Sequence, residues 1–254
     1  MSRSDGRSPA EPRSVEIVPH FHRNAEGSVL YRAGGTVVLC TASIDAVVPA
    51  WMAGKGKGWL TAEYQMHPRA SRARREAREG RGKSPSGRTQ EIQRLIGRAL
   101  RSAIDLDAVG ERTIVIDCDV LEADGGTRTA SVTGGFVAMA LALAKLRTSS
   151  VVPPVLRDQV AAISVGHVGG EAMLDLVYEE DSQARVDLNV VATARGAIVE
   201  VQATAEGEAL ERRALDGMID VGLAGVAQLV TMQRSALAAA GVELASLFQA
   251  GRFA

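Results

Sequence analysis

The chain has 254 residues, of which 46% are hydrophobic and 23% are charged, and its formal net charge at pH 7 is −1. These values are typical of a globular protein with one large or two small domains, and they argue against bulk electrostatic attraction to nucleic acid. No run of eighteen apolar residues and no apolar N-terminal stretch occurs, so we expect no membrane span, no signal peptide and a cytoplasmic location. Residues up to about Pro12 are polar and are expected to be loosely held.

The first half of the chain begins with predicted strands. Apolar residues alternate or cluster between turn-forming residues, which predicts strands over Ser14–Pro19, Gly27–Ala33, Thr36–Asp45 and Trp59–Met66. Cys40 and Cys118 lie on separate apolar segments, and none of the four histidines has metal-motif spacing. We therefore expect buried free thiols and no zinc site.

A basic segment follows the fourth strand. Residues 69–88 contain eight basic and two acidic residues, and nearly all of the basic ones are arginine, which suits bidentate contacts with phosphate. The segment ends in a flexible loop that places Arg88 just before the next helix. The alternative interpretation is a solvated helix face.

A helix is predicted over Glu91–Leu106 from apolar residues at i, i+3 and i+4, and a strand is predicted over Thr113–Leu121. The next helix is predicted over Ala130–Leu146. The short, proline-containing stretch Arg147–Pro154 is the best internal boundary, so we divide the chain into residues 1–150 and 151–254.

The turn Asp124–Ser131 (DGGTRTAS) joins that strand to that helix. Its glycines allow close approach of the backbone, and the unpaired N–H groups at the helix start favour an anion such as phosphate. Arg128 adds a bidentate guanidinium, and hydroxyls of Thr127 and of Thr129 or Ser131 can donate hydrogen bonds. The alternative is a glycine turn whose Thr or Ser only caps the helix.

The second half again places strands before a helix. Strands are predicted over Ala161–Val168, Glu171–Tyr178, Arg185–Thr193 and Ile198–Thr204, and a helix over Leu215–Leu237. The repeated order indicates an α+β duplication.

Two aspartates, Asp181 and Asp187, are predicted to meet across a hairpin between the second and third of these strands. Two close carboxylates either share a proton or hold a cation between them, and Mg²⁺ is the natural ion because it leaves coordination sites for substrate phosphates. The alternative is that both aspartates serve only as turn residues.

Several ordered motifs together resemble the ribonuclease PH family over roughly residues 7–237. They are Ala25–Ser28 (AEGS), Cys40–Ser43 (CTAS), Gly58–Tyr64 (GWLTAEY), Gly87–Gly97 (GRTQEIQRLIG), Asp117–Thr129 (DCDVLEADGGTRT) and Glu200–Gly207 (EVQATAEG).

The resemblance implies a phosphate-dependent 3′→5′ exoribonuclease, a tRNA nucleotidyltransferase that trims 3′ extensions of tRNA precursors, and structured rRNA, and releases nucleoside diphosphates. It implies an α+β fold of duplicated βα halves (ribosomal protein S5 domain 2-like) and a homohexameric ring, a trimer of dimers, that acts on RNA and neither on DNA nor at a membrane. By motif, it assigns phosphate binding to Arg88, Gly126, Thr127 and Arg128, catalysis with Mg²⁺ to Asp181 and Asp187, and RNA binding to Arg69, Arg72, Arg74 and Arg75.

In this interpretation inorganic phosphate is the attacking co-substrate, held by the two arginines and the helix start. Asp187 is either a metal ligand or a general acid to the leaving oxygen. Two other functions stay open: an inactive RNA-binding ring subunit, and a phosphate- or nucleotide-binding hydrolase that releases monophosphates.

Overall fold

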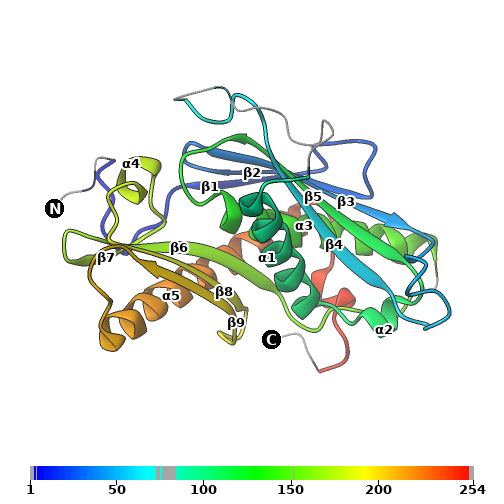
Figure 1. Cartoon of the computed structure of the whole chain (residues 1–254). Helices are drawn as coiled ribbons and strands as arrows, with labels where there is room; N and C mark the ends of the chain where they lie inside the picture. The colour runs from blue at the N-terminus through cyan, green and yellow to red at the C-terminus, as the bar shows by residue number, and fades with distance from the viewer. Residues whose placement is uncertain (1–2, 4, 73–74, 76–83, 151, 252–254) are drawn as a thin grey trace.

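The structure, a computed structural model, describes residue 3, residues 5–72, residue 75, residues 84–150 and residues 152–251. Two β-sheets and their helices make up the fold (Figure 1). The first sheet has the order β1-β2-β3-β5-β4, in which only β4 and β5 are parallel. Its predicted strands are confirmed to within one residue: β1 (Val15–Pro19), β2 (Gly27–Ala33), β3 (Thr36–Asp45), β4 (Trp59–Met66) and β5 (Thr113–Glu122).

Helix α1 (Gly87–Ala103) lies in the crossover that the parallel pair β4 and β5 requires. It begins four residues before the predicted start at Glu91, because Ser86 caps it: the Ser86 hydroxyl accepts a hydrogen bond from the backbone N–H of Thr89 (3.2 Å). It ends before the predicted Leu106, since Ile104 is already extended. The helix therefore starts beside Arg88 and places this arginine in its first turn.

Helix α3 (Thr127–Ser149) packs on β2 and β3 of the first sheet and on β6 of the second sheet. It is apolar on all sides, and Phe136 and Met139 are fully buried. The Thr133 hydroxyl lies 3.1 Å from both the carbonyl oxygen and the amide nitrogen of Ala162 in β6. Helix α3 thus connects the two halves, and its first turn directly follows the glycine turn.

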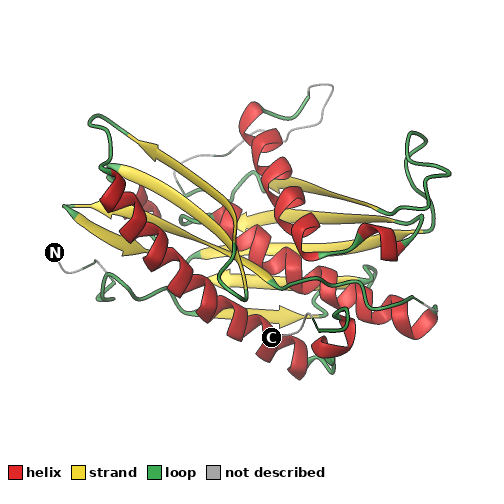
Figure 2. Cartoon of the chain, turned by 90° about the horizontal axis from the view of Figure 1, so that it is seen from below, coloured by secondary structure: helices red, strands yellow, loops and turns green. Residues whose placement is uncertain are grey.

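The second sheet has the order β7-β6-β8-β9 and is antiparallel throughout. It consists of β6 (Val160–Val168), β7 (Glu171–Leu174), β8 (Val186–Thr193) and β9 (Ile198–Ala205). Helix α5 (Arg212–Ala239) runs along this sheet, as Figure 2 shows, and buries Met218, Val226 and Leu229 against it. The predicted order of strands before a helix is confirmed in both halves.

The predicted strand Glu171–Tyr178 is wrong beyond Leu174. Asp175 has a left-handed backbone (φ 52°), which ends β7, and the chain then forms the short helix α4 (Tyr178–Asp181). Asp181 therefore lies on a helix rather than at a strand end.

The two ends of the chain are also held by tertiary contacts. Residues 244–248 return to the first half, where η1 (Leu244–Leu247) packs in the core that also includes α2 (Leu106–Val109). The expectation of a loosely held N-terminus is wrong for residue 3 and residues 5–12. Arg3 is buried and hydrogen-bonds to the second half, and Pro9 accepts a hydrogen bond from the N–H of Leu174 (2.8 Å).

Both cysteines are free and buried, as predicted, and Cys40 lies opposite Cys118 across β3 and β5. By length and composition alone, α3 and α5 could each cross a membrane. In α3, however, 83% of the most apolar stretch is buried inside the protein, as in the core helix of a globular fold; in α5 the share is 33%.

Candidate active site

A cavity of ≈ 1050 Å³ is lined by residues of both halves. Its walls come from β4, the basic segment, the start of α1, the glycine turn, α4, β6 and β8. The residues that matter chemically are Tyr64, Arg72, Arg88, Gly125, Gly126, Thr127, Arg128, Ser164, Asp181, Asp187 and Asn189. The predicted phosphate-binding residues and both predicted carboxylates thus line one cavity.

The glycine turn has a backbone that other residues would not adopt without strain. Gly125 and Gly126 have φ angles of 79° and 64°, and a Cβ on Gly125 would lie 2.3 Å from the carbonyl oxygen of Leu176. The Thr36 hydroxyl donates to the carbonyl of Gly125 (2.6 Å) and fixes the turn from the side of β3. Helix α3 begins directly after the turn, so its first N–H groups have no partners within the helix and can bind an anion.

The hydroxyls of the first turn of α3 differ in their availability. The Thr127 hydroxyl hydrogen-bonds to the hydroxyl of Tyr64 (2.9 Å) at the cavity wall. The suggestion that Thr129 or Ser131 donates to a ligand is wrong, because both are buried and donate to the carbonyls of Gly126 (2.9 Å) and Thr127 (2.8 Å). Each of these hydroxyls reaches the carbonyl three or four residues before it in the chain.

Two arginines bring positive charge to the cavity. The Arg128 side chain is 15% exposed and donates to Gln202 of β9 (2.7 Å) and, more weakly, to Glu91 of α1 (3.5 Å). Arg88 is exposed in the first turn of α1, and it has no hydrogen-bond partner among the described residues. The Arg128 guanidinium is therefore oriented by neighbours, whereas Arg88 is available to a ligand.

The carboxylates Asp181 and Asp187 come together without the predicted hairpin. That hairpin is wrong because β7 and β8 both pair with β6, and α4 lies between them in the chain. Asp181 is on α4 and Asp187 on β8, where Asn189 donates to it weakly (3.5 Å). Burial raises the pKa of both carboxyls, and the charge of Asp187 raises the pKa of Asp181 further.

Arg128 and Arg88 act on both carboxylates in the opposite direction and lower their pKa values. This electrostatic coupling places the two cations and the two anions within interaction range of one another. Such a site can bind a phosphate at its cationic side and a cation, or a proton, at its anionic side.

Sequence reasoning missed several residues that line the cavity, among them Tyr64, Ser164, Tyr178 and Asn189. Ser164 is 6% exposed, and among the described residues its hydroxyl has no hydrogen-bond partner. A buried hydroxyl without a partner is rare in proteins, so its position on the cavity wall indicates that it meets a ligand or a water. No sequence motif marks it, because a serine within an apolar strand is common.

The predicted RNA-binding arginines are placed in part. Arg69, Arg72 and Arg75 are exposed, Arg72 lines the cavity, and Arg74 lies outside the described residues. The segment begins next to the glycine turn, since Ala70 is buried and accepts a hydrogen bond from the N–H of Ala123 (3.0 Å).

Comparison with known proteins defines the class. The model of the 3′ exoribonuclease family, domain 1, matches residues 11–145, and that of the 3′ exoribonuclease family, domain 2, matches residues 158–253. Together the two models span most of the chain and define it as a member of the 3′ exoribonuclease family. A curated relative, ribonuclease PH of Solibacter usitatus (strain Ellin6076), is 54% identical over 235 residues, which cover 91% of this chain and 98% of the relative.

The chain belongs to the ribonuclease PH family and is a phosphate-dependent 3′→5′ exoribonuclease of the nucleotidyltransferase class.

Solved structures agree on the fold. Rice Rrp46 has a TM-score of 0.75 at 18% identity, covering 92% of this chain and 100% of that chain. The Archaeoglobus fulgidus exosome with RNA bound to the active site has a TM-score of 0.74 at 23% identity, and the match covers 91% of this chain and 92% of that chain. The predicted α+β fold of two related halves is confirmed.

Proposed function

We propose that the ≈ 1050 Å³ cavity is the phosphorolytic site and that it trims the 3′ extensions of tRNA precursors, and structured rRNA, in the cytoplasm. The observation that carries this proposal is the joint placement of two arginines, a glycine turn and two carboxylates in one cavity. A hydrolase needs no second phosphate site beside the scissile phosphate, whereas a phosphorolytic enzyme must hold two phosphate groups together.

In the proposed reaction, an oxygen of inorganic phosphate attacks the phosphorus of the terminal phosphodiester. A new P–O bond forms, the bond to the 3′-oxygen of the penultimate nucleotide breaks, and that oxygen takes up a proton. The released nucleotide is a nucleoside 5′-diphosphate. Arg88, Arg128 and the first N–H groups of α3 bind the attacking phosphate and reduce its repulsion from the RNA phosphate.

The carboxylate side of the cavity fits Mg²⁺. Among the described residues, no group of three or more His, Cys, Asp or Glu side chains could hold a metal. The cavity instead offers two carboxylates, Asp181 and Asp187, and the Ser164 hydroxyl. This set suits Mg²⁺, because the ion binds one or two carboxylates and keeps waters and substrate phosphates as its other ligands. When bound, the ion would supply positive charge to the scissile phosphate and the leaving oxygen.

Asp187 has two possible roles in this site. It can hold the metal with Asp181, or its raised pKa can let it donate the proton that the departing 3′-oxygen needs. We favour the metal role, because Asp187 shares the cavity with a second carboxylate, Asp181, and a cation between the two would offset their repulsion.

The pH profile of the reaction follows from these charges. Because Mg²⁺ binds the ionised pair and burial raises both pKa values in the metal-free site, protons compete with the ion. We therefore expect the rate at subsaturating Mg²⁺ to fall on acidification at a higher pH than ordinary aspartates would give. Arg88→Met removes a charge that lowers both pKa values, so it should move this acid limb to a higher pH. Arg94→Met, on an exposed position of α1, is the control. An acid limb that is the same in wild type and Arg88→Met would contradict this assignment.

The exposed arginines Arg69, Arg72 and Arg75, with Arg74, are proposed to guide the RNA toward the cavity.

We further propose a homohexamer, a trimer of dimers, by analogy with the family. Large apolar side chains that stay exposed in the single chain, among them Val47, Trp51 and Ile198, are available for contacts between copies.

The proposal is tested with a 3′-extended tRNA, phosphate and the purified protein, with and without Mg²⁺. Mapping of the RNA 3′ ends should show stepwise shortening that requires both phosphate and Mg²⁺ and stops near the mature end. If shortening continued unchanged with the metal chelated, the metal assignment would be rejected. If the protein preferred unstructured RNA over the tRNA, the substrate assignment would be rejected.

A further inference from the structure

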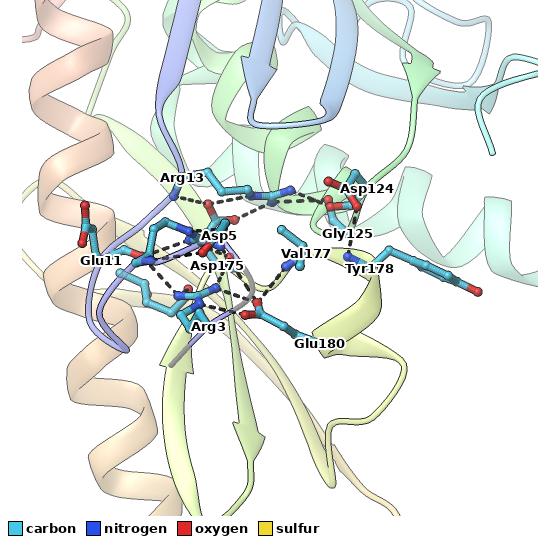
Figure 3. A network of polar contacts seen from close by, with 12 residues as sticks. Arg3, Asp5, Glu11, Arg13, Asp124, Gly125, Asp175, Val177, Tyr178 and Glu180 are labelled. Carbon is cyan, nitrogen blue, oxygen red and sulfur yellow. Dashed lines mark hydrogen bonds and ion pairs between the residues drawn. The ribbon is translucent and has the colours of Figure 1, made fainter. Parts of the chain in front are cut away.

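The N-terminal segment, residue 3 and residues 5–13, contacts the glycine turn and helix α4, which both line the cavity (Figure 3). Its arginines Arg3, Arg7 and Arg13 reach partners more than 160 residues away in the chain, between Leu174 and Glu180. This segment takes no part in the reaction described above, yet it contacts the glycine turn and the helix that carries Asp181.

Arg13 connects the glycine turn to the second half. Its guanidinium donates to both carboxylate oxygens of Asp175 (3.0 and 2.6 Å), and its backbone N–H donates to the same carboxylate (2.9 Å). On the other side it donates to the carbonyls of Asp124 (2.5 Å) and, at longer range, Gly125 (3.4 Å). Burial raises the pKa of Asp175, but Arg13 outweighs burial and holds it below the usual value, so the pair is ionised.

Arg3 fixes helix α4. It is 5% exposed, and its guanidinium binds both carboxylate oxygens of Glu180 (2.9 and 2.7 Å) and the carbonyls of Leu174 (2.8 Å) and Asp175 (3.0 Å). Glu180 in turn accepts a hydrogen bond from the N–H of Val177 (3.1 Å) and so caps the first turn of α4. Glu180 directly precedes Asp181 in this helix.

The two connections join into one network. The Asp124 carboxylate accepts a hydrogen bond from the N–H of Tyr178 (3.2 Å), which links the glycine turn to the start of α4. Figure 3 shows Arg13, Asp124 and Tyr178 on one side of this network and Arg3 with Glu180 on the other. The phosphate-binding turn and the helix that carries Asp181 are thus joined by one network, in which Arg3 and Arg13 of the N-terminal segment take part.

A four-residue helix has little stability of its own, so α4 depends on these contacts for its position. Without Arg3, the Glu180 carboxylate would lose its bidentate partner. Water would then compete with the Val177 N–H for this carboxylate, which would weaken the cap of α4. The turn itself would remain fixed by Thr36 and Arg13. Loss of Arg3 should therefore move Asp181 more than it moves the phosphate-binding residues.

We propose that Arg3 is a positioning residue for the phosphorolytic reaction: through Glu180 it sets the place of Asp181, and Arg13 with Asp175 sets the glycine turn against it. The proposal rests on the function assigned to the cavity above. It assigns a catalytic contribution to an N-terminal segment that touches neither phosphate nor RNA in that assignment.

The test compares Arg3→Met with Arg98→Met as a matched control. Arg98 also makes a bidentate ion pair between the two halves, with Glu200 (3.0 and 2.6 Å), but it contacts neither α4 nor the glycine turn. We expect Arg3→Met to lower kcat by about 10- to 100-fold while KM for phosphate changes by less than about threefold. Arg98→Met should change kcat by less than about twofold. Equal losses in the two variants, or an unchanged kcat in a folded Arg3→Met protein, would overturn the proposal.

A double variant separates positioning from a general loss of structure. If Arg3 acts through Asp181, then adding Arg3→Met to Asp181→Asn should lower the residual rate little further, whereas independent effects would multiply. If Arg3→Met does not fold, Glu180→Gln, which keeps a side-chain oxygen for the Val177 N–H, takes its place in both comparisons. If the rate losses of the two single variants multiplied in the double variant, the proposal would be overturned. A fully active Asp181→Asn would instead reject the cavity assignment on which the proposal rests.

Discussion

Replacement of Asp187 by asparagine is expected to lower kcat by at least about 100-fold without loss of the fold. Asparagine has nearly the same shape, but it lacks the negative charge that the site uses to hold a cation or a proton beside the scissile phosphate. Stability should not fall. Since folding raises the pKa of Asp187, its ionised form opposes folding above the pKa of the unfolded chain, so a neutral side chain is equally or better tolerated at pH 7.

The measurement for this variant is the initial rate of nucleotide release at saturating phosphate, together with Tm. Asp216→Asn on α5 is the control, because Asp216 is an exposed aspartate, paired with Arg212, that is absent from the cavity lining. A folded Asp187→Asn protein with near wild-type kcat would remove Asp187 from the reaction. A Tm well below that of wild type would show that the charge is structural.

Replacement of Arg128 by methionine is expected to raise KM for phosphate by about 10- to 100-fold, because a charge-assisted hydrogen bond to a phosphate oxygen is worth about 1.5–3 kcal/mol. Arg128 is 15% exposed, and Gln202 already orients its guanidinium, so little ordering remains to be done when phosphate binds. Arg128→Lys keeps the charge but loses the planar guanidinium, so its KM for phosphate should lie between those of the wild type and Arg128→Met.

Phosphate dependence of the rate is measured for each Arg128 variant beside Arg147→Met. Arg147 lies in the last turn of the same helix, where it donates to the carbonyl of Ser246, and it is absent from the cavity lining. We expect an unchanged KM for that control. If Arg128→Met retained the wild-type KM for phosphate, the nucleophile would have to bind elsewhere.

The sheets could be predicted from the sequence because their apolar residues mark the buried face directly. In β5, for instance, Ile114, Ile116, Cys118 and Val120 alternate with more exposed positions, and all four are buried. The glycine turn could be predicted as well, since its position between a strand and an apolar helix is a local signal.

The arrangement around Asp181 could not be predicted in the same way. Residues 171–178 look like a strand, but the chain leaves that conformation at Asp175, which has a left-handed backbone and whose carboxylate binds Arg13. Similarly, the polar N-terminus gives no sign of its partners, because Arg3 and Glu180 are 177 residues apart. Such contacts depend on the tertiary fold, and no periodicity encodes them.

We propose above that this cavity joins inorganic phosphate to the terminal nucleotide of an RNA. This proposal is tested most directly by incubating the protein with a 3′-extended tRNA, Mg²⁺ and radiolabelled inorganic phosphate, and by separating the released nucleotides. We expect the label to appear in nucleoside diphosphates, and we expect Arg128→Met and Asp187→Asn each to suppress this labelled product. Release of unlabelled nucleoside monophosphates, or tight RNA binding without any released nucleotide, would contradict the proposal.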